Sequence, residues 1–583
     1  MRELFRTSAS IDKRKLIPNR WDMFALLFVF TCLALLGTAA HQMSVPYHLG
    51  QQIAVSLSPD KLPSYAMQTV LRMFIALFFS LLFTFTVCTL AAKNKHAEKI
   101  IIPIIDILQS VPVMGFLSIT VVGFIALFPG SLWGAQCAAI FAIFTSQVWN
   151  MALSFYQSLR TLPAELREAS DMFHLSAWQR FWRVEVPFAM PGLLWNTMLS
   201  MSASWFFVVA SEAVTVSNQT ITLPGIGSYI ALAILHKNVH AVIYTIITMF
   251  TVILLYDQLL FRPLIKWSDR FRIEQSSTAV QTKNSWIGNI FRRTFLMKYI
   301  GILLAVLADK WINFSFFSFT HSEKMSESKS YSPWINKIIL ILWYSVLVVL
   351  IVYTVIYLWH FIFATVNFAE VKHVFLWGFF TLLRVFAIVL ISTIVWVPLG
   401  VWIGLRPQWA EIIQPIAQFL AAFPVNLLFP LFVIVIVRYH LNVDIWTTPL
   451  MLLGTQWYIL FNVIAGASSL PKDLRQAADN FGVTGWLWWK RLILPGIFPY
   501  YITGAITAVG NAWNTSTVAE VVSWGSTTLH AHGLGAYIME YSAEGNFPYL
   551  VLGICVMSIF VLTLNRLLWR PLYQLAQRKY QLD

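Results

Sequence analysis

The stretches at 162–187, LPAELREASDMFHLSAWQRFWRVEVP, and at 470–495, LPKDLRQAADNFGVTGWLWWKRLILP, decide the fold of this chain. They align without a gap when the residue number rises by 308, as from Leu162 to Leu470. Prolines, charged residues and a tryptophan match in this alignment: Pro163 with Pro471, Arg167 with Arg475, Asp171 with Asp479, Trp178 with Trp486 and Pro187 with Pro495. Any two membrane segments share hydrophobicity, but matched polar and structure-breaking residues in one register indicate an internal duplication.

The duplication extends over most of both halves of the chain. Downstream, the same register matches three features: Trp205 with Trp513, Glu212 with Glu520, and the G-x-G at 225–227 with that at 533–535. Upstream the shift becomes 312 and matches Arg72 with Arg384 and Pro112 with Pro424. We therefore expect two homologous halves in the same orientation, and the boundary between them is the natural path for a solute.

The composition of the chain identifies the solvent that surrounds it. Of 583 residues, 58% are hydrophobic and 11% are charged, and the mean hydropathy is +0.68. No water-soluble arrangement hides that much apolar surface, so we predict an integral membrane protein. A soluble enzyme, a disordered chain and a disulfide-rich secreted module are excluded. The four cysteines lie in apolar runs and are interpreted as packing residues: Cys32, Cys88, Cys137 and Cys555.

We expect an all-α integral membrane protein with about 12 transmembrane helices, arranged as two parallel six-helix repeats. Apolar stretches of about 20 residues or more, enough to cross a bilayer, occur at 22–41, 65–92, 101–128, 133–155, 187–212, 240–262, 337–365, 375–405, 411–438, 446–468, 495–522 and 547–568. The predicted domains are a first repeat at 1–270, a cytoplasmic linker at 271–332 and a second repeat at 333–583. Within the linker, 299–308 is apolar but too short to cross, which favours an interfacial helix.

The basic residues predict the orientation of the chain in the membrane. There are 40 lysines and arginines against 26 aspartates and glutamates. In a membrane protein such an excess marks cytoplasmic loops rather than a nucleic-acid surface. Basic residues gather before the first span, in alternate loops and after the last span, whereas the loop at 213–239 holds only Lys237. This pattern places both termini in the cytoplasm.

The two stretches quoted first are polar loops inside an apolar protein. In the first copy, Glu165, Arg167 and Glu168 alternate with apolar residues, as in an amphipathic helix that begins after Pro163. An element this short is not stable through its own helix propensity. We therefore expect each loop to dock on another surface.

At these residues the chain resembles the EAA loop of the permease subunits of bacterial ATP-binding-cassette importers. The family pattern is E-A-A, then a Gly several residues later, then a pair that ends in Pro. The two copies here read Glu168-Ala169-Ser170, His174 and Val186-Pro187, and Gln476-Ala477-Ala478, Gly482 and Leu494-Pro495. The flanking tryptophans, the paired prolines and the closing G-x-G are similar to the nitrate, sulfonate and taurine branch of that family.

The resemblance implies that each loop forms a coupling helix seated on a separate ATPase subunit. The residues implied in this contact are Glu168, Ala169, Asp171, His174, Gln476, Ala477, Asp479 and Gly482. His174 replaces the expected Gly and Gln476 the expected Glu, so unequal engagement of the two loops is a further expectation. The family also implies a periplasmic or lipid-anchored binding protein, a small anionic solute and the bacterial cytoplasmic membrane. ATP would be held by the partner subunit, and this chain itself would carry no cofactor.

Charged residues deep in apolar spans are costly and are therefore candidates for function. Arg72 and Arg384 lie about two turns into their spans. Glu212 and Glu520 end the fifth spans on the same side of the membrane. An Arg–Glu pair in each half would close the outer mouth, and a released arginine could attract an entering anion. The alternatives are a purely structural pair, or arginines that reach the headgroups.

Three further candidates lie about two turns inward of the glutamates: Trp205, Trp513 and Asn514. Their side chains either line the path or belong to the packed core.

Several familiar motifs are absent from the sequence. It holds no G-x-x-x-x-G-K-[ST] loop for ATP phosphates and no H-E-x-x-H, G-x-S-x-G or C-x-x-C motif. We therefore expect no catalytic or metal site, and ATP hydrolysis on a separate subunit. The alternative is a secondary active transporter with a six-plus-six architecture, which also shows parallel repeats. Against it, the loop at 93–99 lacks the G-x-x-x-D-R-x-G-R-R pattern of the major facilitator group. A scaffold without transport would leave the repeated Arg and Glu positions unexplained.

Overall fold

The computed structural model describes residues 55–110, 112–216, 219–268, 333–525 and 527–580, together with 271, 303, 306–307 and 309–313 between the halves. The predicted first span at 22–41, and most of the predicted linker with its interfacial helix at 299–308, lie outside these residues.

The first half is a run of helices interrupted by one β-hairpin. Its elements are η2 (Pro59–Lys61), α3 (Leu62–Phe83), η3 (Thr84–Cys88), α4 (Thr89–Lys93), α5 (Lys95–Ser110), α6 (Val113–Leu127), α7 (Trp133–Arg160), α8 (Ala164–Met172), α9 (Ala177–Arg180), η4 (Phe181–Glu185), α10 (Val186–Ser211), β1 (Ala213–Val216), β2 (Gln219–Thr222), α11 (Ile226–Leu235), α12 (Val239–Tyr256), η5 (Asp257–Phe261) and α13 (Arg262–Ser268).

The second half repeats this order. Its elements are α16 (Pro333–Phe363), α17 (Phe368–Gly404), α18 (Pro407–Ala422), η8 (Val425–Leu427), α19 (Phe429–Arg438), α20 (Val443–Ser468), α21 (Lys472–Asn480), α22 (Gly485–Trp488), η9 (Trp489–Ile493), α23 (Leu494–Ala519), β3 (Val521–Trp524), β4 (Thr527–His530), α24 (Leu534–Glu544), α25 (Phe547–Leu564), η10 (Asn565–Trp569) and α26 (Arg570–Tyr580). From α8 to β2, every boundary recurs 308 residues later in α21 to β4, so the two copies share a backbone as well as a sequence pattern.

Within the described residues, eight helices are long and apolar enough to cross a membrane: Pro59–Lys93, Trp133–Arg160, Ala177–Ser211, Val239–Ile265, Phe368–Gly404, Val443–Ser468, Gly485–Ala519 and Phe547–Ala576. They overlap the spans predicted at 65–92, 133–155, 187–212, 240–262, 375–405, 446–468, 495–522 and 547–568. α16 covers residues 337–363 of the span predicted at 337–365. The structure therefore has the expected character of a helical membrane protein, whereas the expected number of 12 spans stays a prediction.

Two sequence predictions need correction. The third span of each half, predicted at 101–128 and 411–438, is not one helix but two, α5 with α6 and α18 followed by η8 and α19. The breaks fall at the equivalent residues Pro112 and Pro424, both in extended backbone conformation, because proline disfavours helix in the residue before it and donates no hydrogen bond. The all-α prediction also missed the antiparallel hairpins β1–β2 and β3–β4.

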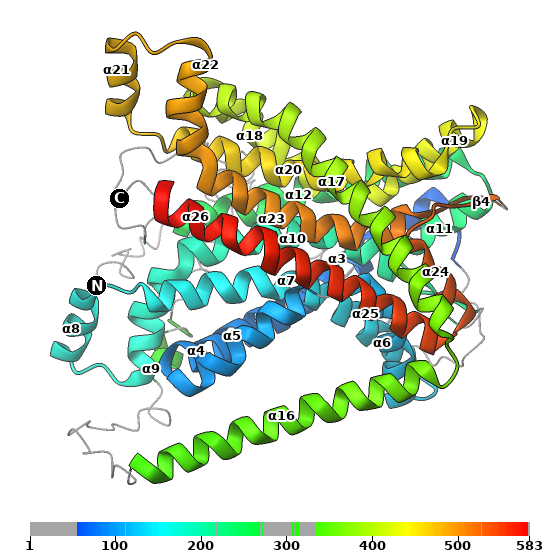
Figure 1. The fold of residues 1–583 in the computed structure, drawn as a ribbon, viewed down its shortest axis with the longest axis horizontal. Coiled ribbons are helices and arrows are strands. Elements are labelled where there is room, and N and C mark those ends of the chain that lie inside the picture. The colour runs from blue at the N-terminus through cyan, green and yellow to red at the C-terminus, as the bar shows by residue number, and fades with distance from the viewer. Residues whose placement is uncertain are drawn as a thin grey trace, which may run out of the picture.

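The elements sort to two ends of the molecule. Figure 1 shows α8 and α21 at one end, and β4, α11 and α24 at the other. We call these the loop end and the hairpin end. The long helix α16 runs along the outside of the bundle (Figure 1), and its described side chains are mostly exposed, as expected for a helix that faces lipid.

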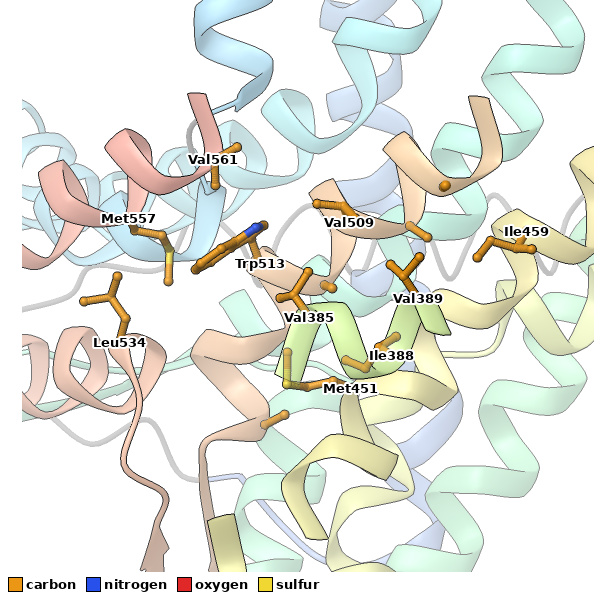
Figure 2. Packing of buried hydrophobic residues seen from close by; sticks show 14 of the residues in the cluster. Val385, Ile388, Val389, Met451, Ile459, Val509, Trp513, Leu534, Met557 and Val561 are labelled. Atoms are coloured by element: carbon orange, nitrogen blue, oxygen red, sulfur yellow. The ribbon is translucent and has the colours of Figure 1, made fainter. Parts of the chain in front are cut away.

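Each half has its own apolar core. In the second half, Figure 2 shows Trp513 of α23 lying near Val385 of α17 and Met557 and Val561 of α25. In the first half, the equivalent Trp205 of α10 belongs to a similar cluster with residues of α3, α11 and α12. Close packing of this kind holds the helices that carry the charged residues.

The halves meet through equivalent contacts. The backbone N–H of Val113, where α6 begins, donates to Asn514 Oδ1 of α23 at 2.7 Å. In the reciprocal place, Asn426 Nδ2 of η8 donates to the carbonyl of Phe206 in α10 at 3.2 Å. Phe206 and Asn514 are equivalent in the repeat, so the interface follows the pseudo-symmetry of the duplication.

Candidate functional site

A buried ion pair joins α3 to the end of α10 at the hairpin end. Arg72 Nη1 of α3 lies 2.6 Å from Glu212 Oε1, and both side chains have no exposed surface. Arg72 also donates from Nε to Gln136 Oε1 at 2.6 Å and from Nη2 to the carbonyl of Pro224 at 2.8 Å. The guanidinium therefore points into the protein, which excludes an arginine that reaches the lipid headgroups.

The same glutamate fastens the β-hairpin and α11 to the bundle. Thr69 Oγ1, one turn before Arg72, donates to Glu212 Oε1 at 2.7 Å, and the Gly227 N–H donates to Glu212 Oε2 at 2.6 Å. The Ile226 N–H donates in turn to Thr69 Oγ1 at 3.1 Å. These amides belong to the first turn of α11, where a carboxylate is stabilised by unpaired N–H groups.

The second half builds an equivalent cluster. Arg384 Nη1 of α17 lies 2.8 Å from Glu520 Oε1, which follows α23, and Thr381 Oγ1 donates to the same oxygen at 2.9 Å. The Gly535 N–H donates to Glu520 Oε2 at 2.8 Å, and the Leu534 N–H to Thr381 Oγ1 at 2.9 Å. The Arg–Glu pairing that the repeat predicted is thus present in both halves.

Two positions distinguish the second cluster from the first. Asp444 stands where the first half has Gln136, and His532 stands where it has Pro224. Arg384 Nη2 lies 3.0 Å from Asp444 Oδ1, and His532 Nδ1 lies 3.0 Å from Asp444 Oδ2. The side chains of Asp444 and His532 are 39% and 67% exposed, so this cluster opens to the surface. Sequence reasoning missed both residues, although a mismatch in the repeat register marked them.

The G-x-G pairs are explained by the glutamates. A Cβ on Gly225 would lie 2.3 Å from Glu212 Cδ, and a Cβ on Gly533 would lie 2.2 Å from Glu520 Oε2. A Cβ on Gly227 would lie 2.0 Å from the carbonyl oxygen of Val209. Only glycine lets the backbone approach this closely. The motif therefore leaves the space that the buried carboxylates occupy.

The inner residues are placed differently from the charged ones. Trp205 and Trp513 are buried in the cores of their halves, which favours the packing interpretation of both. Asn514 is partly exposed and lies between the halves, where it accepts the hydrogen bond from Val113.

Two small cavities lie at the boundary between the halves. Both are lined by Ser202 of α10 and Gln418 of α18; one reaches Asp257 of η5, and the other reaches Tyr458 of α20. Gln418 Nε2 contacts Met198 Sδ at 2.7 Å, and a thioether is only a weak acceptor. Sequence reasoning did not select Ser202 or Gln418; an amide inside an apolar stretch was the available signal.

The predicted coupling residues lie at the loop end. α8 carries Glu168, Ala169 and Asp171, and α21 carries Gln476, Ala477 and Asp479. Both helices protrude, and the side chains that follow them, Phe173 and Phe481, are 71% and 85% exposed (Figure 1). Exposed aromatic residues at a polar tip are typical of a surface that binds another protein.

The two loops end their helices in the same way despite the sequence difference. His174 has φ of 48° and Gly482 has φ of 63°, so both lie in the left-handed region. The Leu175 N–H donates to the Ser170 carbonyl at 3.1 Å, and the Val483 N–H to the Ala478 carbonyl at 2.9 Å. This is the usual glycine-type helix ending, and His174 adopts it although it carries a Cβ.

No metal centre is evident in the part of the chain that the structure describes, where no three His, Cys, Asp or Glu side chains are grouped as metal ligands.

Comparisons with known proteins agree with this architecture. A family model described as "Binding-protein-dependent transport system inner membrane component" matches residues 85–262 and 396–568, one stretch in each half and together more than half of the chain. The "Bicarbonate transport system permease protein CmpB" of Synechococcus elongatus is 24% identical over 176 residues, which are 30% of this chain and 60% of that protein.

Two further relatives match shorter stretches. The "Nitrate import permease protein NrtB" of Synechocystis sp. is 25% identical over 123 residues, 21% of this chain and 42% of that protein. The "Glycine betaine/carnitine transport permease protein GbuB" of Listeria monocytogenes is 32% identical over 116 residues, 19% of this chain and 38% of that protein. Two membrane-component domains in one helical chain place this transport protein in the binding-protein-dependent inner membrane component family of ATP-binding-cassette importer permeases, as an internally duplicated member.

Proposed function

We propose that this single chain supplies both membrane halves of an importer for a small anion, driven by separate ATPase subunits and fed by a periplasmic or lipid-anchored binding protein. The loop end would face the cytoplasm, together with both termini, and the hairpin end would face outward. ATP hydrolysis would take place on the ATPase subunits. Closure of the ATPase dimer on binding ATP would switch the path between the halves from inward-facing to outward-facing.

The observation that carries the proposal is the pair of protruding helices α8 and α21. They share boundaries in the repeat, lie at one end of the molecule and expose aromatic residues beside acidic and small ones. A pair of equivalent docking helices suits a dimeric partner, because each subunit of a dimer offers the same surface. The residues proposed for this contact are Glu168, Ala169, Asp171, His174, Gln476, Ala477, Asp479 and Gly482.

We further propose that the two Arg–Glu clusters hold the outer mouth in its closed form. Each cluster ties the span that carries the arginine to the hairpin and the helix after it through a network of buried hydrogen bonds. Such a network has a defined bonded geometry and is costly to open halfway. It is therefore suited to a gate with two discrete positions.

The cavities at Ser202 and Gln418 support a path between the halves. In the cavity that reaches Tyr458, which has no charged lining residue, the Ser202 hydroxyl and the Gln418 amide offer hydrogen-bond donors to an anion without a fixed charge that would trap it. Relatives named for bicarbonate and nitrate transport match this chain, which favours a small oxyanion. The substrate choice within that class would rest with the binding protein.

Affinity purification of the full-length chain from its native membrane in mild detergent tests the proposal. We expect a Walker-motif ATPase to co-purify and to be lost in Ala169→Glu or Ala477→Glu, because a bulky charge would enter the docking face. Ala164→Glu is the control: it lies at the exposed start of α8, about 140° around the helix from Ala169. All variants should keep the same size-exclusion profile.

A chain that purifies alone, and that transports in proteoliposomes on an ion gradient, would instead establish the secondary-transporter alternative. Retention of the ATPase by Ala169→Glu and Ala477→Glu together would refute the docking assignment while leaving the importer intact.

A further inference from the structure

A short piece of the segment between the halves lies against the first coupling loop. The described residues 309–313 make a turn of helix, in which the Asn313 N–H donates to the Asp309 carbonyl at 3.0 Å. Trp178 of α9 packs edge-on against Trp311, with ring centroids 5.9 Å apart, and Trp178 Nε1 donates to the Trp311 carbonyl at 3.3 Å. An apolar and a polar contact thus coincide at one residue pair.

Polar side chains extend this contact along η4. Arg183 Nη2 donates to Asn313 Oδ1 at 2.8 Å and lies 3.8 Å from Asp309 Oδ1. Gln179 Nε2 donates to the same Asn313 oxygen at 3.5 Å. The contact therefore combines a charge pair, amide hydrogen bonds and edge-on packing of two indoles, which gives it a defined orientation.

The second coupling loop shows the same face uncovered. Trp486 and Leu487 occupy the positions of Trp178 and Gln179, and they are 73% and 51% exposed. Arg491, equivalent to Arg183, is exposed as well.

The covered face is not the one proposed for the ATPase. Residues 309–313 contact α9 and η4, whereas the tip of the loop at Met172 and Phe173 remains exposed. The segment therefore lies along the flank of the loop and leaves the end of α8 open.

We propose that residues 309–313 are an intramolecular brace, a segment that binds the flank formed by Trp178, Gln179 and Arg183 and ties the first coupling loop to the stretch of chain between the halves. Among the residues that the structure describes, none makes such a contact with the equivalent face of the second loop. The consequence of this brace rests on the proposed function. The first loop then moves with its ATPase subunit as a rigid unit, whereas the second loop keeps its own local mobility.

The brace itself is tested by thiol labelling of the full-length chain in inside-out membrane vesicles. In a background without the four native cysteines, Gln179→Cys and Leu487→Cys are labelled with a membrane-impermeant maleimide. We expect Gln179→Cys to react several-fold more slowly, because the neighbouring segment covers it. The probe removes the longest of the three hydrogen bonds to residues 309–313, together with the bond from the Ser176 N–H to Gln179 Oε1 that caps α9, and leaves the contacts of Trp178 and Arg183 intact.

Charge variants identify the partner of the loop. Arg183→Glu should raise the labelling rate of Gln179→Cys to that of Leu487→Cys, and adding Asp309→Arg should restore protection. Arg491→Glu, the matched change in the second loop, should leave both rates unchanged. Equal rates at the two cysteines before any charge change, or a failure of Asp309→Arg to restore protection, would overturn the brace.

These measurements need no ATPase and so separate the two proposals. Slow labelling with rescue, in a chain that captures no ATPase, would support the brace and refute the proposed function. Capture of the ATPase by a chain whose two cysteines are labelled at equal rates would support the proposed function and refute the brace.

Discussion

The two charged clusters at the hairpin end share one scaffold and differ in what surrounds it. In the first half, Arg72 faces a single carboxylate, and its other partners are the neutral Gln136 side chain and a backbone carbonyl. In the second half, Arg384 lies between two carboxylates, those of Glu520 and Asp444. The first cluster is sealed, whereas the second reaches the surface through His532.

The difference shows what duplication within one chain permits. Two separate copies of one subunit would carry identical clusters, but two fused halves can diverge. Here the Arg–Glu–Thr frame is kept in both, since it anchors the hairpin and the following helix. The positions around it have diverged, so that one cluster is fully buried and the other reaches the surface.

The largest expected effect comes from removing the carboxylate in each half. Glu212→Gln leaves Arg72 buried without any counter-charge, and breaking a buried pair in this way costs about 3–5 kcal/mol. Glu520→Gln leaves Asp444 beside Arg384, so we expect roughly half that loss. The temperature at which detergent-solubilised protein loses half of its folded size-exclusion peak measures both.

The double variant Glu520→Gln with Asp444→Asn sharpens this comparison. It leaves Arg384 without a carboxylate partner, as Glu212→Gln leaves Arg72. Its loss of folding free energy should therefore approach that of Glu212→Gln. If Glu212→Gln and Glu520→Gln lower the transition temperature equally, Asp444 does not share the charge of Arg384.

A middle-sized effect is expected at the glycines that seat the carboxylates. Gly533→Ala would place a Cβ 2.2 Å from Glu520 Oε2, and this carboxylate cannot move without breaking its hydrogen bonds. Forced overpacking of this kind costs about 1–3 kcal/mol, and Gly225→Ala should behave alike. Gly510→Ala is the control, because no atom lies within 4 Å of its Cβ position.

Gly510 lies within α23, so alanine there should be neutral or stabilise by about 0.5–1 kcal/mol. The same transition temperature reports on all three variants. A loss in Gly510→Ala as large as that in Gly533→Ala would mean that glycine flexibility, not the fit of the carboxylate, is what the hairpin end requires.

The repeat made part of this architecture predictable and left part of it hidden. Matched Arg and Glu positions on the same side of the membrane made an Arg–Glu pair possible in each half, because charged residues deep in apolar spans are costly without a partner, and the structure shows both pairs. The helix breaks at Pro112 and Pro424 were missed, since hydropathy averages over side chains and a single backbone restriction does not change the average.

Other features depend on contacts between distant parts of the chain. Asp444 and His532 meet only when α20 and the second hairpin are folded together, and the contact of Trp178 with Trp311 joins segments far apart in sequence. The four-residue strands were too short to show an alternating pattern of their own. Pair contacts of this kind leave no periodic signal in one sequence.

The smallest expected effect compares the ends of the two coupling helices. His174 and Gly482 share a left-handed conformation, which costs a residue with a Cβ about 1–2 kcal/mol relative to glycine. Gly482→Ala should therefore destabilise the second loop by about 1 kcal/mol. His174→Gly should gain less than the full difference, because glycine also adds freedom to the unfolded chain.

Amide hydrogen exchange at 173–175 and 481–483 in the reconstituted protein measures both local changes. We expect exchange to quicken at 481–483 in Gly482→Ala, and to change little at 173–175 in His174→Gly if contacts on α9 already hold the first loop. A strong slowing in His174→Gly would instead mean that the strain at His174 sets the opening of that loop. The asymmetry between the loops would then originate in one residue rather than in the segment between the halves.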